Sequence, residues 1–458
     1  MKKLLFPLAI LIATFAQAQD DQKQIRSIYD AALTESEAYE NLRVLCKDIG
    51  ARLSGSEQAD KAVVWGEEVL NKLGLDSVYL QEITVPHWYR GKKKERAYFF
   101  NEKGKVYLDV CALGGSVGTG MNQFISGEVI EVHSLEEIAE MDSNVVAGKI
   151  IFYNRPMDPK HISTFKAYGG CVDQRYSGAI EAAKKGAIAV LVRSMGLRQD
   201  DFPHTGTMAY EEGITKIPAL AVSTNGANYL SENLKKTPKL DLALKTSCET
   251  LPDKVSYNVI GEIRGSKYPD IFITVGGHLD SWDLGEGAHD DGAGTVQSIE
   301  VLHLLKTLNI KPQYTIRCVL FMNEENGNRG GISYAERAIQ EKEKHLAAFE
   351  SDRGGFSPRG FSVNGSAKRL ESIQAWASLL KPYGLHEFEA GFAGVDINPL
   401  KNDTICLIGL SPDSQRYFDH HHTDDDVFET VNKRELELGA ASMTALIYLI
   451  DKYWKYPN

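Results

Sequence analysis

The sequence has little that would place the protein in a membrane or on a nucleic acid. After residue 20 it has no apolar run long enough to cross a bilayer, no internal repeat and no low-complexity tract. Its 62 acidic residues outnumber its 51 basic residues, which gives a formal net charge of −11. Such an acidic balance disfavours phosphate backbones and anionic lipid surfaces as partners. We therefore expect no nucleic-acid partner and no membrane span in the mature chain.

Cysteine is scarce, and two common zinc motifs are missing. The six cysteines include no C-x-x-C pair, which is unlike a zinc knuckle or a dense disulfide scaffold, and their spacing selects no disulfide pairing. The H-E-x-x-H motif of single-zinc peptidases is also absent. The six positions are Cys46, Cys111, Cys171, Cys248, Cys318 and Cys406.

The first residues, MKKLLFPLAILIATFAQAQ, have a pattern typical of export. Lys2 and Lys3 precede an apolar stretch, and an A-x-A sequence ends at Ala18. This pattern predicts that residues 1–18 are a secretory signal peptide, cleaved after Ala18. A membrane anchor is the alternative, but the apolar stretch is too short to span a bilayer comfortably. We expect a protein that is exported to the periplasm or secreted.

From residue 254 onward, strand-like and helix-like patterns alternate. Strand-like runs such as IFITV and YTIRCVLFM are each followed by an amphipathic run such as TVQSIEVLHLLKTL. This alternation predicts an α/β fold with a mixed, mostly parallel sheet between helices. Near the start, Ser56 is suited to cap a helix that begins at Glu57, and Gly74 is suited to end it.

The middle of the chain has a different texture. Short β-rich runs alternate with turns between residues 120 and 250, which predicts a smaller α/β insert. The glycines of GGSVGTG, residues 114–120, suggest its first boundary. The predicted division after the signal peptide is 19–118 for the N-terminal part of the main unit, 119–252 for the insert and 253–458 for the rest.

Four segments rich in aspartate, glutamate and histidine follow predicted strands. They are GGHLD (276–280), NEEN (323–326), ESD (350–352) and HHHTDDD (420–426). One such loop alone is more often a solvated turn. Ligands of open α/β sheets bind at the carboxyl ends of the strands, where all four segments are expected to lie. The sequence therefore predicts one shared site.

The donor types in these segments select the metal. Imidazole nitrogen together with carboxylate oxygen suits zinc or a similar transition ion better than calcium or magnesium. The number of donors exceeds one tetrahedral site and suits two ions that share a carboxylate, about 3.5–4 Å apart. We therefore predict a two-metal centre.

Together these motifs resemble the di-zinc exopeptidases, the family that includes aminopeptidase Y, glutamate carboxypeptidase and carboxypeptidase Q. HLDSWDLGEGAHDDGAG, NEEN, ESD and YFDHHHTDDD are most similar to the carboxypeptidase Q branch, as is ARLSGS near the start. AGKII, GAIEAAKKGAIAVLV and IPALAVS are similar to a protease-associated domain. The resemblance extends over essentially the whole mature chain. It implies a zinc-exopeptidase fold interrupted by a protease-associated insert at 119–252.

The resemblance also implies roles for individual residues in a site with two Zn²⁺ per chain. It assigns His278, Asp290 and Asp352 to one ion, and Asp290, Glu325 and His422 to the other, with Asp290 bridging. Glu324 would be the general base, and Asp280 would orient the imidazole of His278. A cis peptide bond between Asp290 and Asp291 is a further expectation from the family.

Three more residues are candidates for substrate binding. Arg353 and Arg359 follow the third acidic segment, and we hypothesise that one of them binds a substrate carboxylate in bidentate fashion. An internal ion pair is the alternative for each. In relatives a tyrosine before the histidine ligand steadies the oxyanion, so the resemblance makes His421 a candidate for that role here. His289 is expected to be a loop residue, and Asp424, Asp425 and Asp426 are expected to cap the following turn.

Together with the resemblance, these features predict a secreted di-zinc exopeptidase, similar to carboxypeptidase Q, that hydrolyses dipeptides or short peptides. A homodimer is a possible state of the protein. An aminopeptidase of the same family is the main alternative. A receptor-like relative without catalysis is disfavoured because every expected ligand is present. A serine hydrolase at Ser116, in GGSVG, is disfavoured because that motif needs a strand before the serine and a helix directly after it.

Overall fold

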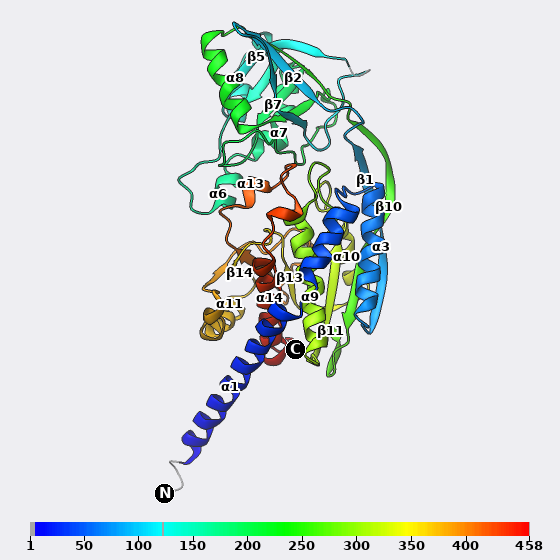
Figure 1. Ribbon diagram of the computed structural model, residues 1–458, viewed down its shortest axis with the longest axis vertical. Coiled ribbons are helices and arrows are strands. Elements are labelled where there is room, and N and C mark those ends of the chain that lie inside the picture. The colour runs from blue at the N-terminus through cyan, green and yellow to red at the C-terminus, as the bar shows by residue number, and fades with distance from the viewer. Residues whose placement is uncertain (1–4, 121–122, 458) are drawn as a thin grey trace.

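The computed structural model describes residues 5–120 and 123–457, and it contains two eight-stranded sheets. Figure 1 shows an elongated molecule with one sheet in each half. The predicted fold class is confirmed, because the first sheet is mixed and lies between helices while the second belongs to a smaller β-rich unit. We call the half that contains the first sheet the peptidase unit and the half that contains the second sheet the insert.

The first sheet has a parallel centre and antiparallel flanks. Its strands, in spatial order, are β1 (Ser77–Tyr89), β10 (Glu249–Ile263), β12 (Tyr314–Phe321), β11 (Tyr268–His278), β13 (Lys344–Glu350), β16 (Cys406–Pro412), β14 (Pro358–Asn364) and β15 (Glu387–Ala390). The four central strands β12, β11, β13 and β16 run parallel, so their carboxyl ends share one edge. All eight residues of β12 are buried, as expected for a strand covered on both faces.

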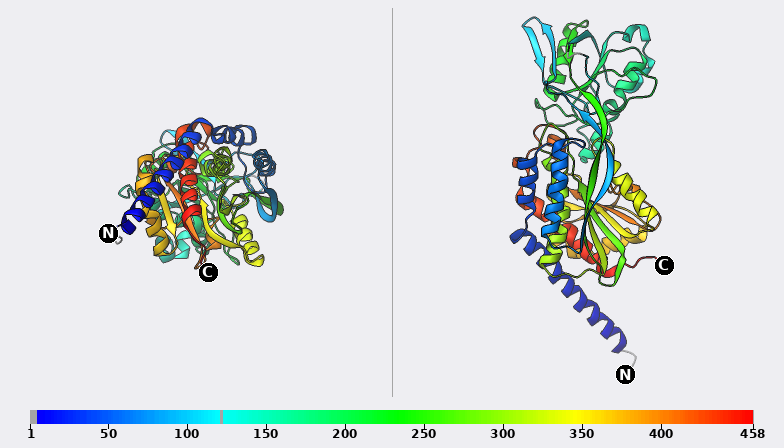
Figure 2. Two further views of the ribbon diagram at one scale, coloured as in Figure 1. Left: turned by 90° about the horizontal axis from the view of Figure 1, so that it is seen from below. Right: turned by 90° about the vertical axis from the view of Figure 1, so that its right-hand side faces the viewer.

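Helices cover both faces of this sheet, as the right-hand view of Figure 2 shows. The main ones are α1 (Leu5–Thr34), α3 (Glu57–Lys72), α9 (Ala293–Thr307), α10 (Arg329–Gln340), α11 (Ala367–Ala375) and α14 (Lys433–Tyr453). Alternate residues of β12 enter different cores. Ile316, Cys318 and Leu320 pack with residues of α9 and α14, whereas Val319 and Phe321 pack with residues of α10. This division follows from the two-residue period of a strand.

The N-terminal helices agree with the sequence pattern where the structure describes them. The Ser56 side chain accepts a hydrogen bond from the Ala59 amide at 3.1 Å, and Gly74 has the left-handed φ of +61° beyond the end of α3. Residues 1–4 of the predicted signal peptide lie outside the described residues, and α1 continues through the predicted cleavage point after Ala18. Among the described residues, no helix is long and apolar enough to span a membrane.

The second sheet belongs to the insert. Its strands, in spatial order, are β3 (Gly104–Leu108), β2 (Arg96–Asn101), β9 (Asp241–Lys245), β5 (Ile125–Val132), β6 (Ile150–Tyr153), β7 (Ala189–Arg193), β8 (Ala219–Val222) and β4 (Val110–Ala112). The helices α6 (Thr164–Gly169), α7 (Asp173–Lys184) and α8 (Thr224–Lys236) pack around it. The runs that predicted strands and a helix between residues 127 and 222 form β5, β6, α7, β7 and β8.

Strand pairing divides the chain differently from the predicted point at 118/119. Strands β2, β3 and β4 precede that point but hydrogen-bond within the second sheet, to β9 and β8. The long antiparallel pair β1 and β10 connects the two halves instead (Figure 1), with Ser77 opposite Glu262 and Tyr89 opposite Glu249. The glycines at 114–120 lie in a loop beside this connection, so their composition suggested a boundary where the chain only turns.

The insert packs against the carboxyl edge of the first sheet. In Figure 1, α6 lies beside α13 (Tyr417–His420), a short helix of the peptidase unit. A small apolar core joins them, with Met157 and Ala167 from the insert and Phe356, Tyr417 and Phe418 from the peptidase unit. The insert therefore covers the edge at which the four acidic and histidine-rich segments were expected.

Candidate metal centre

The four segments do meet at that edge. His278 is the last residue of β11, Glu324 and Glu325 lie in the turn after β12, and Asp352 follows β13 by two residues. Asp290 lies in a short turn, η2 (Ala288–Gly292), which leads into α9. His421 and His422 follow α13. The parallel centre of the sheet thus brings together residues that are up to 144 positions apart in the sequence.

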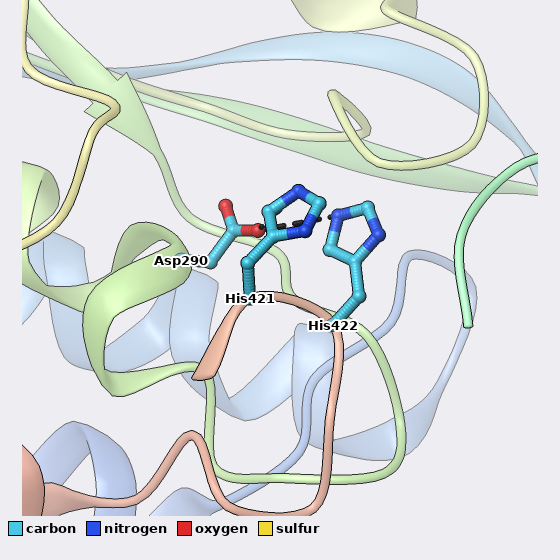
Figure 3. A group of neighbouring side chains, drawn as sticks. All are labelled: Asp290, His421 and His422. Atoms are coloured by element: carbon cyan, nitrogen blue, oxygen red, sulfur yellow. Dashed lines mark ion pairs between the residues drawn. The ribbon is translucent and has the colours of Figure 1, made fainter. Parts of the chain in front are cut away.

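Asp290 is the central residue of the cluster. Its Oδ1 lies 3.2 Å from His278 Nε2, and its Oδ2 lies 3.2 Å from His422 Nε2 and 3.6 Å from His421 Nε2. His278 Nε2 is also 3.6 Å from Asp352 Oδ1. Two candidate metal-binding triads result, His278–Asp290–Asp352 and Asp290–His421–His422. Figure 3 shows how both imidazoles of the second triad point toward the Asp290 carboxylate.

Glu325 belongs to the same cluster through its contact with His422. Its Oε2 lies 3.2 Å from His422 Nε2, and its Oε1 accepts a hydrogen bond from the Trp282 amide at 3.2 Å. The peptide bond between Asp290 and Asp291 is cis, as the family resemblance implied. Every ligand position that the sequence suggested therefore lies in one buried cluster.

The chemistry of this cluster fits a pair of zinc ions. Burial acts to raise the pKa of Asp290, but the imidazoles of His278 and His422 beside its carboxylate hold that pKa well below its usual range. Burial raises the pKa of Glu325 well above its usual range and that of Glu324 to about 8. Asp290 Oδ2 and Asp352 Oδ1 are buried without a hydrogen-bond partner among the described residues. Crowded carboxylates with free oxygens beside imidazole nitrogens are the donors that zinc prefers.

Asp280 contacts His278, but not as the sequence suggested. The main-chain oxygen of Asp280 lies 3.0 Å from His278 Nδ1, whereas its carboxylate is 3.8 Å away. That carboxylate accepts the amides of Asn323 at 2.7 Å and Glu324 at 3.1 Å. The predicted carboxylate contact is therefore corrected. The main chain orients His278, and the Asp280 side chain holds the turn that contains Glu324.

The ARLSGS motif holds two of the site's loops. The buried Arg52 donates to the main-chain oxygens of Leu279 at 2.6 Å, Glu286 at 2.6 Å and Gly287 at 2.9 Å. Ser54 Oγ donates to Asn326 Oδ1 at 2.8 Å, which holds the turn after β12. The motif supported the family resemblance, but its role depends on contacts more than 220 residues away, which the sequence does not display.

The insert also contacts a candidate ligand directly. His422 Nδ1 donates to the main-chain oxygen of Thr205 at 3.3 Å, and the Thr205 amide donates to the His422 oxygen at 2.9 Å. Such a contact fixes the tautomer so that Nε2 keeps its lone pair for a metal. Nothing in the sequence around Thr205 indicates this role, because the two residues are 217 positions apart.

Asp426 and His289 support the turn that carries Asp290. The Asp426 carboxylate accepts the amides of His289 at 2.7 Å and Asp290 at 3.1 Å, so it caps this turn and not the one that follows it in sequence. His289 Nδ1 accepts the Gly355 amide at 3.1 Å, and its ring stacks on Phe356 with centroids 4.2 Å apart. His289 therefore lies in the supporting structure, outside both candidate triads.

A cavity of about 370 Å³ opens onto the cluster. Its walls include Asp290, Glu324, Glu325, Asp352, Arg353, His421 and His422 from the peptidase unit, and Phe165, Tyr168, Arg175 and Thr207 from the insert. The cavity therefore lies between the two units. Both units contribute to whatever binds there.

The two arginines proposed for substrate binding differ. Arg353 lines this cavity and donates to the Phe392 oxygen at 2.7 Å and to Ser411 Oγ at 3.1 Å, without a carboxylate partner among the described residues. Arg359 lies in an adjoining cavity and pairs with Asp413 at 3.0 Å. Arg359 therefore forms the internal ion pair that was the alternative to substrate binding, and it does not reach the metal cluster.

Ser116 does not form a hydrolase site. It is only 1% exposed, and its Oγ accepts the Ala219 amide at 2.9 Å. Strand β5 is the next regular element after it, starting at Ile125, so no helix follows directly. The context that a nucleophilic serine requires is missing from this part of the described chain.

Comparison with known proteins identifies the family of this chain. The sequence profile of Peptidase family M28 matches residues 258–447, which contain all the candidate ligands. Human carboxypeptidase Q is 34% identical over 435 residues, which cover 95% of this chain and 89% of that protein. The crystal structure of a Peptidase M28 precursor from Shewanella amazonensis has a TM-score of 0.91 at 32% identity, covering 96% of this chain and 99% of that chain.

A zinc aminopeptidase from Bacillus subtilis shares the fold more distantly, with a TM-score of 0.64 at 20% identity over 91% of this chain and 96% of that chain. The chain therefore belongs to peptidase family M28, and it is a zinc exopeptidase. Within that family it is related to carboxypeptidase Q.

Proposed function

We propose that this protein is an exported di-zinc exopeptidase that hydrolyses dipeptides or short peptides. The observation that carries the proposal is the position of Asp290, whose two oxygens face two separate sets of candidate ligands on the wall of the cavity. A cavity of about 370 Å³ is at the small end of the range for ligand pockets, which favours a short substrate.

In this proposal His278, Asp290 and Asp352 hold one zinc ion. For the second ion we favour Asp290, Glu325 and His422, because Glu325 Oε2 is closer to His422 Nε2, at 3.2 Å, than His421 Nε2 is to Asp290 Oδ2, at 3.6 Å. His421 then faces the cavity, where its ring is stacked on His422 with centroids 3.5 Å apart. We assign it to steadying the substrate carbonyl oxygen.

Glu324 is the proposed general base. A bound zinc pair supplies Lewis acidity, which lowers the pKa of a water molecule and polarises the scissile carbonyl. Glu324 accepts the proton of that water and passes it to the leaving amine. Its turn is fixed by the Asp280 carboxylate, which binds the Glu324 amide, and by Ser54, so the base has a defined position. Phe165 and Tyr168 of the insert line the same cavity and give it two aromatic side chains near this wall.

Export is a further part of the proposal. The Lys2–Lys3 pair, the apolar stretch and the A-x-A sequence that ends at Ala18 support cleavage after Ala18. Determining the N-terminal sequence of the mature protein from the periplasm or the medium tests this. A mature chain that still begins before Ala18 would contradict it. The possible homodimer stays a prediction, to be checked by light scattering on the mature protein.

A panel of free and blocked dipeptides tests the activity. We expect hydrolysis of free dipeptides, loss of that hydrolysis after treatment with a chelator, and its return with Zn²⁺. N-blocked dipeptides would remain substrates of a carboxypeptidase, and C-terminal amides would remain substrates of an aminopeptidase. Activity that is insensitive to the chelator, or the absence of bound metal in protein purified without chelator, would contradict the proposal.

A further inference from the structure

We propose that the cavity beside the metal site receives the far part of peptides longer than a dipeptide, and that it selects peptides with a positively charged group there. The far part means the residues beyond the two that flank the scissile bond. This inference rests on the proposed peptidase function and names a substrate class for it. We call this second cavity, of about 610 Å³, the side cavity; both the peptidase unit and the insert line it.

The side cavity continues from the cavity that contains the metal cluster. The two cavities share three wall residues, Phe165, Arg353 and Phe392. Arg353 fixes this junction, because it donates to the Phe392 oxygen at 2.7 Å and to Ser411 Oγ at 3.1 Å. Its guanidinium carbon also lies 5.5 Å from the centre of the Phe165 ring. A peptide that reaches the metal cluster can therefore continue past Arg353 into the side cavity.

One face of the first sheet forms the floor of the side cavity. Glu387 of β15 lies opposite Gly360 of β14, and Gly360 lies opposite Ser411 of β16. Two residues further along β15, Glu389 lies opposite Ser362. Residues that are directly opposite in a sheet point to the same face. The small residues leave a hollow in the middle of the floor, and the two glutamates lie along its outer side.

The outer side of the side cavity is negatively charged. Arg359 is neutralised by Asp413 at 3.0 Å. Glu389 has no ionic partner among the described residues, and Glu387 only approaches a neighbouring histidine, at 3.6 Å. The remaining cation of the described lining is Arg353, which lies at the junction. A positive group at the far end of a substrate, either a terminal amine or a lysine or arginine side chain, complements this charge.

Exposed apolar side chains accompany the two glutamates. Ile162 of the insert is 86% exposed and Phe392 of the peptidase unit is 53% exposed, and both line the side cavity. The segment before α6 lies on the side of the insert that faces the peptidase unit (Figure 1). Apolar walls beside carboxylates suit the aliphatic stem and charged end of a lysine or arginine side chain.

The first test varies the length and charge of the substrate. It compares dialanine with alanine tetrapeptides that have Lys, Ala or Glu at the residue farthest from the scissile bond. The dipeptide panel identifies which end that is. We expect kcat/KM for tetraalanine to be at least that for dialanine, and KM for the Lys peptide to be about fivefold below that for the Glu peptide. Blocking the far terminus separates a terminal amine from a lysine side chain as the bound cation.

Substitution of the glutamates tests the charge preference. The double variant Glu387→Gln/Glu389→Gln should remove most of the difference in KM between the Lys and Glu peptides, and it should change kcat/KM for dialanine by less than about twofold. The matched control is Glu371→Gln, an exposed glutamate of α11 that lines neither cavity. This control should keep the preference for the Lys peptide.

Filling the side cavity tests the length preference. Gly391 lines it, and a Cβ added there would meet only Ser362 Cβ, at the ordinary contact distance of 3.5 Å. Gly391→Leu therefore fits the fold and occupies the side cavity. It should raise KM for all three tetrapeptides by about tenfold and leave the hydrolysis of dialanine within about twofold of the wild type.

Three results would overturn the inference. They are a wild type that hydrolyses dialanine but no tetrapeptide, equal KM values for the Lys and Glu peptides, and a Gly391→Leu variant that impairs the dipeptide as much as the tetrapeptides. A wild type that hydrolyses none of these peptides contradicts the proposed function instead. In that case calorimetry with the Lys and Glu tetrapeptides still tests the side cavity, and equal binding of the two would overturn its role.

Discussion

Asp290 shows how one residue can organise a site with two centres. It is 5% exposed, and each of its carboxylate oxygens faces a different histidine at 3.2 Å. The Asp426 carboxylate fixes the Asp290 main chain from behind, through the Asp290 amide. The position of Asp290, the proposed bridging ligand, is thus held by a main-chain contact that does not involve a metal.

Glu324 and Glu325 are neighbours with different expected roles, and substitution separates them. Glu324→Gln should keep both zinc ions and lose activity by about 10³-fold or more in kcat, because glutamine keeps the size of the side chain but cannot accept the proton. Metal analysis together with steady-state kinetics checks this. Glu325→Gln is the comparison, and it should lower the zinc content. Near-normal kcat in the Glu324→Gln variant would show that another group is the base.

Glu343 allows a pH prediction far from the metal cluster. It forms a bidentate pair with Arg317, at 2.8 and 2.9 Å, and contacts His345 at 3.1 Å. Burial acts to raise the pKa of Glu343, but His345 and Arg317 lower it to about 2. The folded pKa is below the unfolded value of about 4.3, so the stabilisation is present above that value and is lost as the pH falls toward 2.

Glu343→Gln should therefore lower the free energy of unfolding at pH 7 by about 2 kcal/mol. The difference between variant and wild type should shrink between about pH 4 and pH 2. Urea unfolding of both proteins across this range measures it. The conservative control is Glu341→Gln, whose carboxylate pairs with Arg337 on an exposed helix surface and should contribute far less. A difference that stays constant with pH would contradict the assignment.

At the scale of elements, the site depends on loops that are held by residues from distant parts of the chain. Arg52 holds the loop after β11, Asp280 holds the turn after β12, and Thr205 of the insert holds the segment after α13. The strands provide the common edge, and these contacts set the loop positions on it. Rigid support of this kind is what a two-metal site with a narrow geometry requires.

Substitution of Gly206 tests the contact between a loop of the insert and His422. Its φ is +131°, and a Cβ added there would lie 2.7 Å from His422 Nδ1 and would also collide with Arg175. Gly206→Ala should therefore displace His422 and lower zinc affinity by about 10-fold or more, together with activity. Zinc titration of the variant against a chelating indicator measures it. Gly213→Ala is the control, since Gly213 also has a positive φ but nothing lies within 4 Å of its added Cβ. Equal zinc affinity in both variants would contradict the conclusion that this loop positions His422.

Much of this arrangement could be predicted from local patterns. The cap at Ser56, the alternating strands and helices, and the acidic segments at strand ends all have signatures within a few residues. The family resemblance added the order of the ligands. Thr205 and Asp426 could not be assigned in the same way, because their roles arise from main-chain contacts over long separations.

The membership of β2, β3 and β4 in the second sheet was missed for a related reason. A strand pattern shows that a segment is extended, but it does not show which sheet the segment joins. The Asp280 carboxylate illustrates the same limit at the scale of atoms, since sequence proximity to His278 suggested a contact that its main-chain oxygen makes instead.

At the scale of the whole molecule, the active cavity lies between two units that are joined by the β1–β10 pair and by the small core around Phe418. Because the metal centre lies at this junction, metal binding there is expected to depend on how the two halves pack together. His422 belongs to the peptidase unit but is held by Thr205 of the insert, so a ligand that fixes His422 also favours the docked arrangement. Metal binding is therefore expected to stabilise both halves together.

Removing and restoring metal tests this coupling. Without metal, the carboxyl groups of Asp290, Glu324, Glu325 and Asp352 are crowded in a buried cluster, which costs free energy. Protein stripped with a chelator should unfold at a lower temperature, and free Zn²⁺ at 100 times its Kd should add about 2.7 kcal/mol per site to the free energy of unfolding. Ca²⁺ at the same concentration should add much less, because two of the ligands are imidazoles.

Calorimetry of the stripped, zinc-loaded and calcium-treated protein measures all three. A single cooperative transition that moves with Zn²⁺ would show that the two units unfold together, whereas a separate transition of the insert that ignores Zn²⁺ would show that the contact between Thr205 and His422 does not couple them.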